Sequence, residues 1–288
     1  MVKTDVAAKD NQGILDRQHR ALTIGVILAI TSVAFEGLAV TTIAPGIAGE
    51  LRGLGLYGWI FSAYLLAQIV GTVVAGQWVD RHGPTLPATV AVAVFGGGLL
   101  LAALAPSMPI LIGSRALQGL GAGALGNCVY ASINLRYADR LRSSMLAVVS
   151  SAYIVPSMVG PFLAGLIAEQ LGWRAVFWLL LPILALSAAL TLPAFRRAGG
   201  VATPVIGRSR LPAALLLAGG TGILLAGLGQ LPGARGLALA AAGIALAAWP
   251  LRSLLPAGTL RARRGLPAAI ATRSLFVAGY FAADTYLV

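Results

Sequence analysis

Long apolar runs separated by short polar segments are the dominant pattern along this chain. Eight such runs lie at 21–44, 56–79, 86–106, 109–131, 144–168, 175–193, 212–230 and 236–251. Each is close to the roughly 20 residues that a helix needs to cross a hydrocarbon core about 30 Å thick. Because lipid offers the backbone no hydrogen-bond partners, each run is predicted to be an α-helix. A ninth run begins near Leu266 and reaches Val288, so the pattern predicts eight spans and the start of a ninth.

The composition and the placement of charge support a membrane protein. The chain is 58% hydrophobic and 10% charged, whereas ordinary globular domains carry about a quarter charged residues. The net charge of +12 would suit a nucleic-acid-binding protein, but most basic residues fall in alternate segments between the runs. The intervening segments hold only Arg52, Arg174 and Arg235. This asymmetry predicts a cytoplasmic N-terminus and argues against a nucleic-acid partner. We also expect the runs to lie in the plasma (inner) membrane.

Two basic segments divide the apolar runs into groups. The segment RRAGGVATPVIGRSR follows the sixth run, and LRARRG follows the eighth; both contain glycine and arginine and are predicted to be connections rather than spans. The predicted fold is an all-α polytopic membrane protein. Its predicted parts are a cytoplasmic tail at 1–20, a six-helix bundle at 21–193, a linker at 194–211, a two-helix hairpin at 212–254, and at 255–288 a basic linker with the incomplete first helix of a second bundle.

Three ionisable residues, Glu36, Arg115 and Asp284, lie inside apolar runs and are therefore candidates for function, because charge is costly at membrane depth. A rise of 1.5 Å per residue places Glu36 about 12 Å, and Arg115 about 9 Å, from the outer ends of their runs. We therefore expect these two side chains to face each other or to share a polar network with Gln118. Asp284 lies at a comparable depth in the ninth run. The alternative role for the pair is a static ion pair that joins two helices.

Four further polar residues inside the runs are candidates for a substrate cavity. Tyr64 and Gln68 are four residues apart and share one helix face, and Gln118 and Asn127 lie on another single helix. The alternative role for each is a hydrogen bond that joins two helices. His19 and His82 lie in the tail and in a loop rather than in a run, so we predict no metal site and no histidine proton relay.

Small residues and prolines in the runs predict how the helices pack. Gly119 and Gly123 are four residues apart, and this spacing lets two helices approach closely in lipid. Pro161 lies within the fifth run and removes a helical hydrogen bond, so a kink is expected there.

Four segments carry a family resemblance. They are GQWVDRHG at 76–83, RALQGLGAG at 115–123, PSMVGPFLAG at 156–165 and LGWRAVFW at 171–178. In this order and spacing they resemble the motifs of the major facilitator superfamily, and the third resembles the fifth-helix motif of its antiporters. Pro84 and Thr85 replace the basic pair that usually follows the first motif, and Pro156 and Ala164 stand where the third usually has glycine.

The resemblance implies particular roles for the matching residues. Gly76, Asp80, Arg81 and Gly83 match a cytoplasmic gate loop that contacts the other bundle. The residues Gly160, Pro161 and Gly165 match the antiporter motif. Glu36, Arg115 and Asp284 would take part in proton coupling.

The function that the resemblance implies is proton-coupled efflux of amphipathic or drug-like compounds. The chain is similar to the fourteen-span drug/proton antiporters, truncated after the first bundle and the hairpin. The proton gradient would supply the energy without a cofactor, and the partners would be the lipid bilayer, a small-molecule substrate and protons. Transport would also need a C-terminal bundle, so this chain alone is expected to be inactive.

Three other functions remain open from the residues. A facilitator or symporter for a small polar metabolite would need several buried hydrogen-bonding side chains, and the runs offer few. A remnant without transport activity is the second alternative. A membrane-embedded enzyme would need a buried catalytic pair or a metal site, and the residues predict neither.

Overall fold

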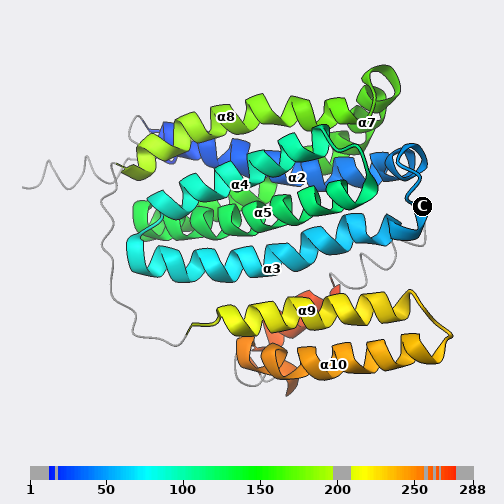
Figure 1. Ribbon diagram of the computed structural model, residues 1–288. Helices are drawn as coiled ribbons and strands as arrows, with labels where there is room; N and C mark the ends of the chain where they lie inside the picture. Colours follow the sequence, from blue (N-terminus) through cyan, green and yellow to red (C-terminus); the bar gives the residue numbers. More distant parts are fainter. Residues whose placement is uncertain are drawn as a thin grey trace, which may run out of the picture. The chain divides into compact units, whose positions relative to one another are not determined.

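The computed structural model of the chain describes residues 13–16, 19–196, 209–255, 259–261, 264–265 and 267–276. Every regular element in these ranges is a helix (Figure 1), so the predicted all-helical fold is confirmed. The elements are α2 (Arg20–Glu50), η1 (Leu54–Leu56), α3 (Tyr57–His82), α4 (Thr85–Ala103), α5 (Met108–Arg136), α6 (Asp139–Ser151), α7 (Ile154–Leu171), α8 (Arg174–Arg196), α9 (Leu211–Leu228), α10 (Ala234–Leu254) and η2 (Thr259–Arg261). Residues 267–276, in the ninth run, are also helical, whereas Asp284 lies outside the described residues.

Seven helical segments in the described part of the chain are long and apolar enough to cross a membrane. They are Arg20–Glu50, Leu54–His82, Thr85–Ala103, Asp139–Leu171, Arg174–Pro193, Leu211–Leu228 and Ala234–Leu254. These segments coincide with seven of the eight predicted runs. The remaining run corresponds to α5, which is 29 residues long but contains many glycines and several polar side chains that lower its hydropathy. The chain is a multi-pass membrane protein.

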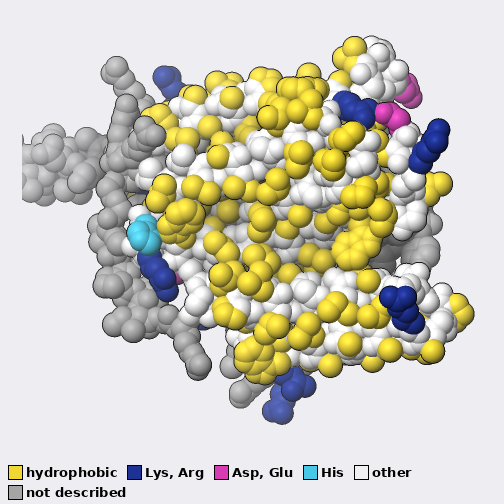
Figure 2. All heavy atoms as spheres, in the orientation of Figure 1, with side chains coloured by type: hydrophobic (Ala, Val, Ile, Leu, Met, Phe, Trp, Pro, Cys, Tyr) yellow, Lys and Arg dark blue, Asp and Glu magenta, His cyan; other side chains and the backbone are white. Residues whose placement is uncertain are grey.

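The surface has the distribution of side chains that a lipid environment requires. Figure 2 shows one face on which hydrophobic side chains cover the middle of the helices, while Lys, Arg, Asp and Glu side chains lie toward the helix ends. Many large apolar side chains are exposed on the outside of the helices; Leu65 and Leu186, for example, are 49% and 54% exposed. In water such exposure would be unfavourable over so large an area, whereas in lipid it is the expected state.

The chain forms two compact units, residues 1–211 and residues 212–288. In the first unit, α5 packs against α3 and α4, while α2 packs against α7 and α8. Contacts between α4 and α8 join these two groups into one bundle. In the second unit, α9 and α10 are connected through residues 229–233, and the hairpin predicted at 212–254 falls within this unit.

The close packing predicted from Gly119 and Gly123 is confirmed. Both glycines face α3, and an added Cβ would collide with the carbonyl oxygen of Tyr64 at the first position and with that of Gln68 at the second. The absence of a side chain at these positions allows the two backbones to approach closely. On the side of α5 that faces α4, a Cβ at Gly121 would lie 2.5 Å from the backbone nitrogen of Phe95. The glycines therefore let α5 fit between two neighbouring helices.

The helical hydrogen bonding of the fifth run is interrupted at Ala152 and Tyr153, between α6 and α7. Helix α7 continues through Pro161, and the kink expected there stays a prediction. The physical cause of the interruption is Pro156, which has no N–H to donate to the carbonyl of Ala152 four residues earlier. The hydroxyl of Thr31 on α2 donates to this carbonyl at 3.5 Å. The interruption is therefore one of hydrogen bonding, because Ala152 and Tyr153 themselves keep helical dihedral angles.

Candidate functional site

Glu36 and Arg115 are brought together in the interior of the first unit. Glu36 comes from α2 and Arg115 from α5, and a guanidinium Nη1 of Arg115 forms an ion pair with Oε1 of Glu36. Both side chains are removed from solvent, with 0% and 2% of their surface exposed. Their matched depths along the sequence predicted this pairing. Two buried charges that neutralise each other in this way avoid the high cost of a single unpaired charge.

Arg115 has three further partners in addition to the carboxylate. Its Nε donates to the carbonyl of Ile60 on α3 at 3.1 Å, and Nη1 donates to Oε1 of Gln118 at 2.6 Å. The guanidinium also lies over the ring of Tyr64, with 4.4 Å between Cζ and the ring centroid. Among the described residues, Oε2 of Glu36 and Nε2 of Gln118 have no hydrogen-bond partner although both are buried. The four side chains form one buried polar cluster that joins α2, α3 and α5.

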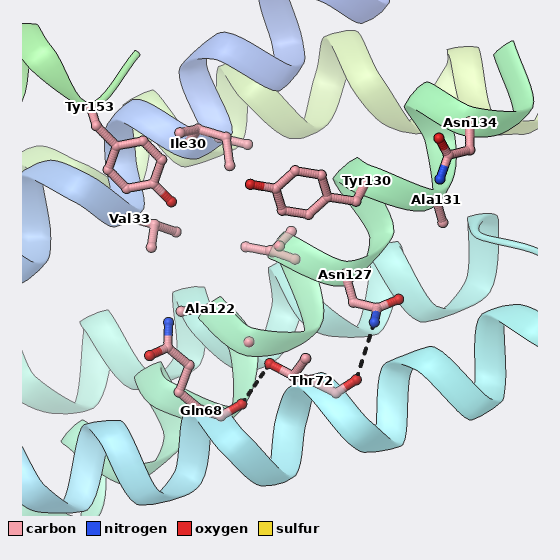
Figure 3. Close-up of a pocket in the computed structure, with 14 residues that line it drawn as sticks. Ile30, Val33, Gln68, Thr72, Ala122, Asn127, Tyr130, Ala131, Asn134 and Tyr153 are labelled. Atoms are coloured by element: carbon pink, nitrogen blue, oxygen red, sulfur yellow. Dashed lines mark hydrogen bonds between the residues drawn. The ribbon is translucent and has the colours of Figure 1, made fainter. Parts of the chain in front are cut away.

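A cavity of about 450 Å³ lies next to this cluster (Figure 3). Its lining comes from α2, α3, α5 and the interruption between α6 and α7. The lining residues are Ala29, Ile30, Val33, Gln68, Thr72, Ala122, Gly123, Leu125, Gly126, Asn127, Tyr130, Ala131, Asn134 and Tyr153. The lining thus combines aliphatic, aromatic and uncharged polar side chains, which suits a ligand with both apolar and polar parts.

The four residues predicted to line a cavity divide into two pairs. Gln68 and Asn127 line it, whereas Tyr64 and Gln118 belong to the polar cluster around Arg115. Asn127 also joins two helices, because its Nδ2 donates to the backbone carbonyl of Thr72 at 3.3 Å. Asn127 therefore has both of the roles that the sequence left open, because it lines the cavity and also joins α5 to α3.

The cavity also contains residues that the sequence reasoning missed. Tyr130 and Asn134 follow Asn127 by three and seven residues, so all three share one face of α5. This spacing was visible in the sequence and would have extended the predicted lining. Tyr153 gave no such signal, since it lies on a different segment, between α6 and α7, and no spacing along the chain relates it to this face of α5.

The polar cluster and the cavity are one helical turn apart on three helices. On each helix, a residue of the cluster lies three or four positions from a residue of the lining. The three pairs are Glu36 and Val33 on α2, Tyr64 and Gln68 on α3, and Gln118 and Ala122 on α5. Residues at this spacing lie one above the other on a helix face. The ion pair therefore lies next to one end of the cavity, and a movement of either side chain would alter that end.

The residues that match the cytoplasmic gate loop lie at the end of α3. Gly76, Asp80 and Arg81 are helical, and the helix continues to His82. Asp80 and Arg81 are exposed. Gly83 ends the helix with a φ of 74°, a left-handed conformation that glycine adopts without strain. The segment is thus a helix end followed by a tight turn, and its gating role stays a prediction.

The residues that match the antiporter motif lie where α7 packs against α2. A Cβ added at Gly160 would lie 3.6 Å from Cδ2 of Phe35, and one at Gly165 would lie 3.7 Å from Cγ2 of Thr42. These are ordinary van der Waals distances, so α7 does not need glycine here for close approach. Pro161 lies between them within the helix.

A second polar cluster lies at the C-terminal end of α2. It links this helix end to the start of α8 and to the segment between α4 and α5. Trp173 donates its indole N–H to Oε2 of Glu50 at 2.8 Å, and Arg174 donates to Oε1 at 2.5 Å. Arg174 also donates to the carbonyl of Ala105 at 3.0 Å and stacks on the ring of Trp173. The motif LGWRAVFW contains two of these residues, but the sequence did not reveal that Glu50 is their partner.

The solved structures include a chain with a similar fold. The crystal structure of an auto inhibited POT family peptide transporter matches with a TM-score of 0.50 and 17% sequence identity, over 83% of this chain and 56% of that one. At this identity the match supports the arrangement of helices alone.

Curated proteins with similar sequences are transporters by name. A protein named "Probable multidrug-efflux transporter" from Mycobacterium tuberculosis is 32% identical over 219 residues, which are 74% of this chain and 46% of that protein. The multidrug transporter protein MdtP of Bacillus subtilis is 31% identical over 56% of this chain and 30% of its own length. The efflux pump dotC of Dothistroma septosporum is 30% identical over 60% and 31%. This chain therefore spans less than half the length of each of these relatives.

The sequence profile of the Major Facilitator Superfamily matches residues 22–287, which is nearly the whole chain. This match agrees with the membrane-length helices and with the four motifs. The chain belongs to the major facilitator superfamily.

Proposed function

We propose that this chain is part of a proton-coupled secondary transporter that exports amphipathic, drug-like compounds across the plasma membrane. The observation that carries the proposal is the cavity without charged side chains that begins one helical turn from the Glu36–Arg115 ion pair. The printed names of the relatives, which include multidrug-efflux transporters, support the same class of activity.

Competition for the Glu36 carboxylate would couple proton movement to the cavity. When the carboxylate is ionised, it neutralises Arg115; when it takes up a proton, Arg115 keeps Ile60 and Gln118 as acceptors but loses its counter-charge. A buried charge without a counter-charge is costly, so the proton shifts the equilibrium toward arrangements in which Arg115 finds another partner or water. Such an arrangement changes the end of the cavity formed by Val33 and Ala122.

Alternating access would require a second bundle. In transporters of this kind, two bundles rock against each other around a site near the middle of the membrane. We expect the first unit to transport only together with a second six-helix bundle, as in a fourteen-span antiporter. Asp284 would belong to the coupling machinery of that second bundle. Asp80 and Arg81 at the end of α3 would contact it on the cytoplasmic side, the side on which the N-terminus would also lie.

A vesicle assay tests the proposal. Everted inner-membrane vesicles, in which export appears as uptake, are energised to create a proton gradient and given a panel of amphipathic fluorescent dyes. We expect gradient-dependent uptake when the chain is extended through a second bundle, and none from the 288-residue chain alone. Uptake by the short chain would mean that it forms a second bundle from copies of itself or from a partner. Uptake that survives a protonophore would indicate a facilitator and contradict proton coupling.

The role of Glu36 has its own test in the same assay. We expect Glu36→Gln to abolish gradient-driven uptake while the protein still inserts into the membrane, because the amide cannot take up a proton. Glu50→Gln is the matched control, since this carboxylate lies at an exposed helix end. Undiminished gradient-driven uptake by Glu36→Gln would remove the residue from the coupling role.

A further inference from the structure

Gln118 and Glu36 contact the same nitrogen atom of Arg115. The amide Oε1 of Gln118 accepts a hydrogen bond from Nη1 of Arg115 at 2.6 Å, and this Nη1 also forms the ion pair with Oε1 of Glu36. All three side chains are buried, and Gln118 is 0% exposed. A neutral amide and a carboxylate thus hold one guanidinium group together, away from solvent.

The amide is held in position by a neighbouring helix. A Cβ added to Gly98 of α4 would lie 2.7 Å from Cγ of Gln118 and 2.8 Å from its backbone nitrogen, so α4 passes directly against this residue. Arg115 is held in turn by the carbonyl of Ile60 and the ring of Tyr64. Polar groups that are fixed in advance need no reorganisation when the charge beside them changes.

Gln118 has hydrogen-bonding capacity left for either charge state of Glu36. Its amide oxygen has two lone pairs, of which Arg115 uses one, and among the described residues its buried Nε2 has no partner. An ionised carboxylate needs donors, whereas a neutral carboxyl group also needs an acceptor for its proton. The amide offers both kinds of group, but the guanidinium offers donors alone.

The two charge states of Glu36 depend on Gln118 to different extents. While the carboxylate is ionised, it supplies Arg115 with a counter-charge, and the bond to Gln118 adds to that interaction. Once Glu36 is neutral, Arg115 keeps its charge in a buried site, where the oxygens of Gln118 and Ile60 remain to stabilise it. Hydrogen bonds to a charged group are the stronger kind. Gln118 therefore stabilises the neutral state of Glu36 more than the ionised state.

The other titratable groups close to this cluster are tyrosines. Tyr64 of α3 lies against the guanidinium, and Tyr153 interacts electrostatically with Tyr64. Apart from Arg115, the charged side chains on the helices that pack against α2 or α5 lie near helix ends, and α4 has none. Because tyrosine is neutral below about pH 10, Arg115 and the groups that hold it govern the protonation of Glu36.

We propose that Gln118 is a positioning residue that sets the pH at which Glu36 takes up a proton, because it holds Arg115 after the carboxylate has lost its charge. This inference rests on the proposed function, since it assigns the regulation of the same coupling site. It gives the amide a role distinct from the cavity lining that the sequence predicted for it.

Infrared difference spectroscopy over a range of pH tests the proposal on the purified 288-residue chain in lipid. The C=O band of a protonated carboxyl group that is absent from Glu36→Gln belongs to Glu36, and its growth on acidification gives a midpoint. Gln118→Met keeps the length of the side chain but removes its oxygen. We expect this change to lower the midpoint by about one pH unit, a tenfold loss of proton affinity, as for one hydrogen bond to a charged group.

Gln77→Met is the matched control, because this amide of α3 donates to the carbonyl of Val73 on its own helix. We expect the control to leave the midpoint nearly unchanged. Equal midpoints for Gln118→Met and the unmodified chain would overturn the proposal. Elution of each variant at the same volume in size-exclusion chromatography confirms that the fold is kept.

A second background separates positioning from packing. If Gln118 acts through Arg115, then Gln118→Met should no longer shift the midpoint of Glu36 in a chain that already carries Arg115→Met, because interacting residues are not additive. A shift of the same size in that background would overturn the proposal, since the amide would then act on Glu36 without the guanidinium. Where Arg115→Met does not fold, the comparison of Gln118→Met with Gln77→Met decides.

The titration also separates this inference from the proposed function. A shifted midpoint in Gln118→Met, without gradient-driven uptake by the extended protein, would support the role of Gln118 and contradict the transport proposal. Gradient-driven uptake whose pH dependence is the same with and without Gln118→Met would support transport and overturn the role of Gln118.

Discussion

Arg115 of α5 forms an ion pair with Glu36 of α2 at a depth where both side chains are shielded from solvent. The pair connects two helices that belong to different groups within the first unit, since α5 packs against α3 and α4 whereas α2 packs against α7 and α8. A change in the charge of either residue therefore acts on the junction between these groups as well as on the adjacent cavity.

The energetics of this pair can be measured with single and double substitutions. Arg115→Met leaves the Glu36 carboxylate without its partner and should destabilise the bundle by about 3–5 kcal/mol if the carboxylate remains ionised. The double variant Glu36→Gln with Arg115→Met removes both charges and should recover most of that loss. The measurement is the thermal unfolding of purified protein in detergent, over a range of pH. A double variant as unstable as Arg115→Met would show that the pair itself, rather than an unpaired charge, determines the stability.

Glycine substitutions should separate two helix interfaces. Gly119→Ala and Gly123→Ala place a Cβ against the backbone of α3, and backbone cannot move aside as a flexible side chain can. Each should destabilise the fold by at least about 1–3 kcal/mol, the usual cost of overpacking. Gly160→Ala is the matched control, because its Cβ would make an ordinary contact with Phe35; this variant should change stability by less than about 1 kcal/mol.

Thermal unfolding of the three alanine variants under identical conditions checks these expectations. If Gly123→Ala proved as stable as Gly160→Ala, the close approach of α3 and α5 would be contradicted.

The cluster at the end of α2 should depend more on Arg174 than on Glu50. Glu50 takes part in an exposed ion pair, which contributes at most about 1 kcal/mol. Arg174 also donates to the carbonyl of Ala105 and stacks on Trp173, and all of these contacts are lost together in Arg174→Ala. We therefore expect Arg174→Ala to lower the unfolding temperature more than Glu50→Gln.

Salt provides the complementary measurement for this cluster. High salt screens the exposed ion pair between Arg174 and Glu50, but it leaves the stacking on Trp173 and the hydrogen bond to the uncharged carbonyl of Ala105 largely intact. The difference between Glu50→Gln and the unmodified chain should shrink as salt is added, whereas that of Arg174→Ala should largely persist. Equal responses of the two variants would contradict the division of contacts seen in the structure.

Much of the fold could be read from the sequence because lipid allows few structures. An apolar run in a membrane must be helical to satisfy its backbone, so the approximate limits of the seven membrane-length helices in the described part of the chain followed directly from hydropathy. The pairing of Glu36 with Arg115 was also predictable, because two opposite charges at one depth have a strong reason to meet. The glycines at 119 and 123 predicted close packing because their spacing repeats on one helix face.

The division of the polar residues depended on tertiary structure. Tyr64 and Gln68 share one face of α3, and the sequence assigned both to a cavity, yet Tyr64 lies beneath Arg115 and only Gln68 reaches the lining. Depth in the membrane follows from position along the chain, but the partner that a side chain meets depends on how each helix is turned about its axis. That rotation is set by packing against neighbouring helices.

The sequence by itself determined that this chain is a helical membrane protein of the major facilitator superfamily with an acid and an arginine at one depth. Only the tertiary structure decided that Tyr153 enters the cavity beside Tyr130, and that Glu50 binds Trp173 and Arg174. The physical reason is the same in both cases. These contacts join residues far apart in the chain, through the packing of α5 beside the segment between α6 and α7 in one case and through the packing of helix ends in the other. No local pattern of residues records which distant segments meet.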